Sequence, residues 1–140
     1  SLIYRSLLKN GDTVDFGAVS VGNAHMVIFT DDFKSDHIEQ IRTKLSVAEI
    51  FPQDVMIDFA CITGEHSLQL KTFPLGRETS VSSGSSACAA AAVAISQGRL
   101  TSKVQVKCQD GSLDIEWGGG RNELIMSGPA KRVYEGSILL

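Results

Sequence analysis

The chain has 140 residues, of which 43% are hydrophobic, and its formal net charge at pH 7 is −3. This length suffices for one domain with its own core, so we treat residues 1–140 as a single domain. Charges of both signs are interspersed without a basic stripe, so we expect no nucleic-acid partner. No apolar run is long enough to cross a bilayer, and the first residues lack a signal-peptide core, so we expect no membrane partner.

The first predicted elements are two strands and a helix. "FGAVSV" (16–21) and "HMVIFT" (25–30) have strand composition and flank the turn "GNA". A helix then begins at Ser35 or Asp36, both of which are good N-caps. Its apolar residues recur at i, i+3 and i+7, namely Ile38, Ile41 and Leu45. This single apolar stripe predicts a helix on the surface.

Two further strands and a second helix follow. "VMIDFACIT" (55–63) and "SLQLKTF" (67–73) are predicted strands joined by the turn "GEH". The second helix runs from about Ser85 to Gln97 and ends at Gly98, a residue type typical of the C′ position. Its body, "ACAAAAVAI", has no polar face, which predicts a helix buried on all sides.

Three strands complete the pattern: "KVQVKC" (103–108), "SLDIEW" (112–117) and "ELIMSG" (123–128). Residues 130–140 add one or two final strands. Together the elements predict an α+β fold, in which a curved, mostly antiparallel, barrel-like sheet is wrapped around the second helix. The first helix lies outside this sheet.

Small polar residues lead directly into the buried helix, in the run "SVSSGSSA". The N-terminus of such a helix presents free N–H groups and the positive end of the helix dipole, and these favour a carboxylate or phosphate ligand. The candidate ligand residues at this tip are Ser83, Gly84, Ser85 and Ser86. The alternative is simple N-capping by one of the serines.

The turn "GNAH" contributes a second polar pair, Asn23 and His25. Both side chains reach a ligand if the turn opens toward the helix tip. The alternative is a turn asparagine beside a histidine whose hydrogen bonds are satisfied inside the protein. His37 and His66 are expected on the surface or in turns.

The residues themselves indicate no nucleophile. Ser83 lacks a G-x-S-x-G elbow and a recognisable triad order. Cys88 falls on the buried helix, where burial raises the pKa of a thiol and makes it poorly reactive. Cys61 and Cys108 lie in strand-like runs and are expected in the core. Three cysteines without metal-ligand spacing indicate reduced thiols, so we expect no metal and a cytoplasmic protein.

Five collinear stretches give the chain a resemblance to the C-terminal half of the diaminopimelate epimerase family. They are "FGAVSVGNAHMVIF" (16–29), "IFP" (50–52), "GRETSVSSGSSACAAAAVAISQGRL" (76–100), "GSLDIEW" (111–117) and "MSGPAKRVYEG" (126–136). The resemblance implies one half of a two-half isomerase of the lysine and cell-wall precursor pathway, with the substrate bound between the halves. It implies no cofactor: one cysteine from each half exchanges the α-proton of an amino acid, whose carboxylate binds at the helix tips.

Several positions depart from the family pattern. Ser83 stands where the catalytic cysteine opens the motif C-G-[ST]-G-[AS]-C-A, and Ser86 replaces a glycine of that motif. Cys88 matches the second, non-catalytic cysteine. The family's substrate-binding asparagine and its Glu–Arg pair correspond to Met56, Pro74 and Leu75. A serine hydroxyl is a much weaker general base than a thiolate, which puts catalysis by this chain in doubt.

Three interpretations remain. The chain is the C-terminal domain of a diaminopimelate epimerase-like protein, inactive as an isolated chain; or it is a degenerate binding or regulatory module with the epimerase fold; or it is a stable fragment without a function of its own. The expected partners are a small amino-acid or anion ligand at the helix tip, and either a missing N-terminal half or a second copy in a symmetric homodimer.

Overall fold

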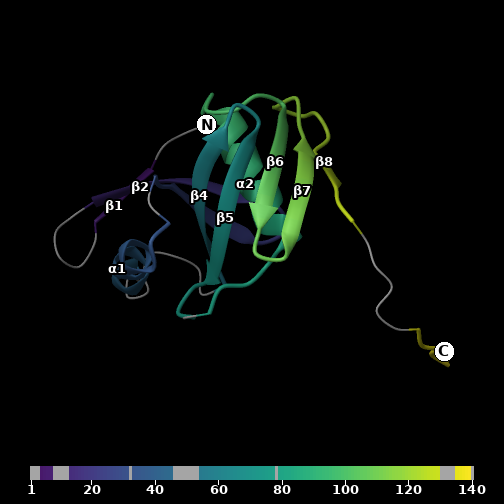
Figure 1. Cartoon of the computed structure of the whole chain (residues 1–140), viewed down its shortest axis with the longest axis horizontal. Helices are drawn as coiled ribbons and strands as arrows, with labels where there is room; N and C mark the ends of the chain where they lie inside the picture. The colour runs from purple at the N-terminus through teal and green to yellow at the C-terminus, as the bar shows by residue number, and fades with distance from the viewer. Residues whose placement is uncertain are drawn as a thin grey trace.

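The structure is a computed structural model that describes residues 4–7, 13–31, 33–45, 54–77, 79–129 and 135–139. Figure 1 shows its strands and helices. In chain order they are β1 (Tyr4–Leu7), β2 (Thr13–Ser20), β3 (Ala24–Phe29), α1 (Ser35–Leu45), β4 (Met56–Gly64), β5 (Ser67–Pro74), α2 (Gly84–Ser96), β6 (Lys103–Cys108), β7 (Gly111–Glu116) and β8 (Ile125–Ser127).

The strands form one mixed sheet in which each strand pairs with its neighbour in the sequence. Pairing is parallel between β3 and β4 and between β5 and β6, and antiparallel in the other pairs of the described chain. The two parallel pairs are those whose connections contain a helix, because a parallel pair needs a crossover too long for a hairpin. Among the described residues β1 and β8 are the two edges, so the sheet is not closed.

The sheet separates two hydrophobic clusters. One cluster joins α2 to alternate residues of the strands, including Ala60, Leu70, Val104 and Ile115. The other joins α1 to the intervening residues of β3 to β5, including Ile57 and Phe59 on β4 and Phe73 on β5. Because side chains alternate between the two faces of a strand, one sheet serves both helices.

Helix α2 contacts every strand from β2 to β7, and in Figure 1 it lies behind β4 to β7. Its alanines at 87, 89, 90, 91 and 94 are fully buried. The contact with β2 is especially close, since a Cβ atom added to Gly17 would lie 2.4 Å from Cγ1 of Val93. Small residues on both elements therefore allow the helix to approach the sheet backbone.

The structure confirms the seven predicted strands and both helices at nearly the predicted positions, and it adds β1, which the sequence patterns missed. Residues 135–139 form no strand, so the predicted final strands are wrong there; residues 130–134 and 140 lie outside the described residues, as does "IFP" at 50–52. No helix in the described part of the chain is both long and apolar enough to cross a membrane.

Cys61 and Cys108, both expected in the core, are only partly buried, and Cys108 packs against the hydrophobic cluster around α2. Cys61 directly follows the buried stretch of β4, and Cys108 is the last residue of β6. Both residues therefore lie where a strand leaves the core.

Candidate functional site

The N-terminus of α2 is capped by Ser83. This residue is extended, with φ −149° and ψ 125°, and its Oγ accepts a hydrogen bond from the backbone N–H of Ser86 at 3.3 Å. The hydroxyl oxygens of Ser83 and Ser85 are 2.9 Å apart. The capping interpretation of the serine run is thus correct for Ser83, and it leaves the N–H groups of Gly84 and Ser85 without an acceptor among the described residues.

A cavity of about 240 Å³ opens beside this cap. It lies between the start of α2 and the turn that joins β6 to β7. Three groups of residues line it. Ser82, Ser83 and Gly84 come from the serine run, Pro129 follows β8, and the others lie at the end of β6, in the turn and at the start of β7: Cys108, Asp110, Gly111, Ser112 and Leu113. The cavity combines a helix N-terminus with one carboxylate, so it suits a ligand that carries both signs of charge.

A buried polar cluster lies behind the first turn of α2. Nδ1 of His25 is 2.8 Å from Oδ2 of Asp58 and 3.5 Å from Oγ of Ser86. The hydroxyl of Thr72 donates to Oδ1 of Asp58 at 2.9 Å. The side chains of His25 and Asp58 are completely enclosed. This cluster therefore connects β3, β4 and β5 to the helix.

Asn23 lies at the outer end of the cluster. Its Oδ1 is 3.2 Å from Nε2 of His25, and the residue is half-buried in the turn before β3. The structure thus joins three of the predicted site residues, Asn23, His25 and Ser86, in one chain of contacts. Asn23 and His25 do not line the cavity beside Ser83.

Burial controls the titration of the nearby groups. It raises the pKa of the Asp58 carboxyl above its usual range, and the hydrogen bonds from His25, Ser86 and Thr72 oppose this only in part. Burial likewise raises the pKa of the Cys88 thiol. The pKa of Cys108 is raised by burial first and by the charge of Asp110 second.

The positions that depart from the family pattern meet in the sheet. Register places His25 opposite Met56 on the parallel neighbour β4, and Met56 opposite Pro74 on β5. Leu75 follows directly and packs against the cluster around α1. Met56, Pro74 and Leu75 therefore form an apolar patch beside the buried His25. The family resemblance implies an asparagine and a Glu–Arg pair at these positions.

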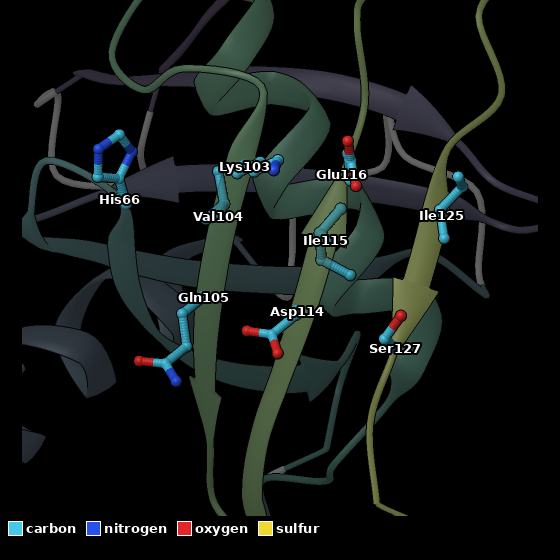
Figure 2. Close-up of a pocket in the computed structure, with 9 residues that line it drawn as sticks. All are labelled: His66, Lys103, Val104, Gln105, Asp114, Ile115, Glu116, Ile125 and Ser127. Carbon is cyan, nitrogen blue, oxygen red and sulfur yellow. The ribbon is translucent and has the colours of Figure 1, made fainter.

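A separate cavity of about 290 Å³ lies on β6 to β8, with Lys103, Asp114 and Glu116 projecting from neighbouring strands (Figure 2). His66 borders it from the turn between β4 and β5, and its Nδ1 is 3.1 Å from the hydroxyl of Thr101. None of the ligand residues predicted from the sequence lines this cavity. The described residues contain no group of three or more His, Cys, Asp or Glu side chains that could hold a metal ion.

Asp58 and Thr72 are not among the site residues that the sequence patterns predict. Asp58 is conspicuous in retrospect, because it is the one charged residue in the apolar run "VMIDFACIT". A buried carboxylate in a strand needs hydrogen-bond partners, and this requirement is the signal that would have singled it out.

Comparison with known sequences identifies the family. The diaminopimelate epimerase family model matches residues 17–133. The diaminopimelate epimerase of Buchnera aphidicola is 35% identical over 91% of this chain and 44% of its own length. That of Pseudomonas syringae pv. tomato is 37% identical over 96% of this chain and 49% of its own length. The chain thus spans about half the length of the curated relatives it matches.

Solved structures share the fold at low sequence identity. A phenazine biosynthesis protein of the PhzF family from Bacillus anthracis superposes with a TM-score of 0.57 at 13% identity, covering 89% of this chain and 38% of that chain. A hydroxyproline epimerase from Agrobacterium vitis, solved with bound trans-4-hydroxy-L-proline, gives a TM-score of 0.55 at 14% identity. The match covers 88% of this chain and 44% of that chain. The match of the family model and the two curated relatives show that this chain belongs to the diaminopimelate epimerase family.

Proposed function

We propose that the chain is the C-terminal domain of an amino-acid epimerase-like protein, that it binds the carboxylate of an amino acid or another small anion at the tip of α2, and that it does not catalyse epimerisation alone. The observation that carries the proposal is the Ser83-capped helix N-terminus, which opens onto a cavity of about 240 Å³. Membership of the diaminopimelate epimerase family supports the choice of ligand class.

The backbone supplies the anion-binding groups of the proposed site. The N–H groups of Gly84 and Ser85 donate to no acceptor within the described residues, and the dipole of a thirteen-residue helix favours negative charge at this end. These features do not depend on the identity of the side chain at position 83. Anion binding therefore survives the replacement of the family's cysteine by serine.

The inactivity of the isolated chain follows from the surroundings of Ser83. Its Oγ contacts the N–H of Ser86 and the hydroxyl of Ser85, but no His, Asp or Glu side chain of the part of the chain that the structure describes. A hydroxyl without an adjacent base stays protonated at neutral pH and is a poor proton acceptor. By the family resemblance, the second acid–base group comes from another half, and this chain spans about half the length of its curated relatives.

We also infer that the sheet curves around α2, as the family resemblance implies, and that the face bearing the helix tip receives either an N-terminal half or a second copy of the chain. Contacts from α2 to six strands support the first point. The exposed hydrophobic residues of β8, Ile125 and Met126, support the second.

Titration of the protein with sulfate and, separately, with diaminopimelate, followed by NMR, tests ligand binding. Sulfate should shift the amide signals of Gly84 to Ser86. Diaminopimelate should bind weakly, because loss of a partner of a charged group costs about 2–5 kcal/mol and Met56, Pro74 and Leu75 supply none. Unchanged amide signals at saturating sulfate would refute the helix-tip site, and tight binding of diaminopimelate would show that these three residues do not impair the pocket.

Proton–deuterium exchange at the α-carbon of diaminopimelate tests catalysis. Ser83→Cys restores the thiol but neither the second base nor the lost ligand contacts, so we expect no exchange above background. Ser82→Cys is the matched control, because it places a thiol one residue earlier on the wall of the same cavity. Exchange that is faster in Ser83→Cys than in Ser82→Cys would show that the isolated domain is catalytically competent.

A further inference from the structure

A cavity of about 430 Å³ opens between β5 and the end of β6, and it has no task in the proposed function. Its wall includes Lys71 of β5 and Lys107 of β6. We infer that these two lysines bind the phosphate group of a small phosphate monoester. The site is separate from the helix tip, since of the described residues only Cys108 lines both cavities. Binding here is independent of the proposed function.

The cavity lies where the pairing of two parallel strands ends. The β5–β6 ladder stops with Gln69 opposite Lys107. Beyond this point β5 pairs with a different segment, because the N–H of Val81 donates to the carbonyl oxygen of Thr72 at 2.9 Å. The end of β6 and the segment around Val81 thus lie beside successive parts of β5, and the cavity opens between them.

The two lysines lie on one face of the sheet without a countercharge on a neighbouring strand. Lys71 is two residues beyond Gln69, which pairs with Lys107, so all three side chains point to the same side. The other neighbour of Lys107 is Ser112 of β7. The neighbour of Lys71 on β4 is Phe59. Two like charges on adjacent strands repel each other, and a bound dianion relieves this repulsion.

The rest of the described chain does not neutralise these lysines either. Neither forms an ion pair with a described carboxylate. No Asp or Glu is among the described residues that line the cavity. Lys103, on the same strand as Lys107, differs because it lies opposite Glu116 of β7. The whole chain carries a formal net charge of −3, so the cavity is a local positive region on an acidic protein.

Hydroxyl, amide and apolar groups complete the wall. The hydroxyl of Ser80 donates to Oε1 of Gln109 at 3.0 Å. Phe33 and Leu70 provide apolar surface. Lysine ammonium groups bind phosphate as point charges, and two of them match the double negative charge of a phosphate monoester. Because the apolar side chains suit the organic part of such a ligand, the wall favours a phosphate monoester over a bare inorganic anion.

Titration with phenyl phosphate followed by NMR tests this site, with inorganic phosphate as a second probe at a pH where both are dianions. Phenyl phosphate should shift the amide signals of Lys107 and Gln109 to saturation. It should bind more tightly than inorganic phosphate, because its ring buries apolar surface against the wall. Lys71→Gln and Lys107→Gln should each bind it about tenfold more weakly, since each lacks one charged donor.

Lys103→Gln is the matched control, because it removes a lysine from the same strand and the same face of the sheet but outside this cavity. It should bind phenyl phosphate as the wild type does. Absence of a saturable shift in the wild type overturns the site, as does equal weakening by Lys103→Gln and Lys107→Gln. Equal affinity for the two probes overturns the assignment to an organic phosphate.

The same titration keeps this site distinct from the helix tip. The amide signals of Gly84 to Ser86 report binding at the tip, and those of Lys107 and Gln109 report binding in the cavity between β5 and β6. A shift at Lys107 and Gln109 that Lys71→Gln weakens, with no shift at Gly84 to Ser86, supports the lysine site and counts against the helix-tip site. A shift at Gly84 to Ser86 alone supports the helix-tip site and overturns the lysine site.

Discussion

The potentially reactive side chains around the start of α2 are held in their protonated forms. Burial raises the pKa values of Cys88 and Cys108, and among the described residues the Ser83 hydroxyl is hydrogen-bonded to Ser85 and Ser86 rather than to a carboxylate or an imidazole. Neither the two thiols nor the Ser83 hydroxyl is therefore a strong base at neutral pH.

The raised thiol pKa values predict slow alkylation. At a given alkaline pH, Cys88 and Cys108 should carry less thiolate than a free cysteine, so their reaction with iodoacetamide should reach its half-maximal rate at higher pH than that of glutathione. Peptide mapping by mass spectrometry follows each cysteine separately. Reaction of Cys88 at a lower pH than glutathione would contradict the effect assigned to burial.

The Asp58 carboxyl predicts a pH-dependent contribution to stability. Its pKa is raised in the folded protein, mainly by burial, against the opposing effects of His25 on β3, Thr72 on β5 and Ser86 on α2. The folded state thus holds this proton more tightly than the unfolded chain. The resulting stabilisation is complete below the usual pKa of aspartic acid and is lost as pH rises through the raised value.

Asp58→Asn cannot ionise and should lack this loss of stability. Urea unfolding of wild type and variant across the acid to neutral range should therefore give free energies of unfolding whose difference changes with pH. Asp114→Asn, on the exposed face of β7, serves as a control for charge removal alone. Parallel pH profiles for wild type and Asp58→Asn would contradict a raised pKa for Asp58.

At the scale of elements, the close packing of α2 in the core depends on the small size of its residues. Ala91 is fully buried, so Ala91→Leu should force side chains apart and reduce the free energy of unfolding by about 1–3 kcal/mol. Ser96→Leu, at the exposed end of the same helix, adds the same side chain without overpacking. Thermal or urea unfolding compares the two variants, and an unchanged stability of Ala91→Leu would refute the close packing around α2.

Gly17 predicts a coupled effect between β2 and α2. Its missing Cβ leaves room for Val93, so Gly17→Ala should destabilise the protein by about 1–3 kcal/mol through overpacking. Val93→Ala removes the clashing Cγ1 atom, and the double variant should therefore recover part of the loss caused by Gly17→Ala. A double-mutant cycle measured by urea unfolding reports this coupling. Additive effects would mean that the two residues do not meet.

At the scale of the whole molecule, the chain spans about half the length of the curated relatives it matches, and we propose that it self-associates when it is studied alone. The exposed side chains of Ile125 and Met126 lie on β8, which is an edge strand in the described sheet. Sedimentation velocity over a range of concentrations should reveal a dimer, and Ile125→Lys should shift it toward monomer. A clean monomer at high wild-type concentration would contradict the proposal.

Local signals in the sequence were sufficient to locate most elements. The serine run places the cap of α2, Gly98 with its positive φ of 72° ends the helix, and the apolar alternation marks the strands, because each feature depends on neighbours within a few residues. Strand β1 escaped prediction because a four-residue edge segment has too few positions to show a pattern. Its identity as a strand depends on pairing with β2.

The sequence by itself determined the family, the limits of α2 and the group of polar residues at its tip. Only the tertiary structure decided that His25 meets Asp58, 33 residues away, and Ser86, 61 residues away. No local pattern encodes these contacts, because they depend on the parallel register of β3 with β4 and on the depth at which α2 sits against the sheet. Burial then raises the pKa of Asp58, and burial is a property of the folded molecule rather than of any segment.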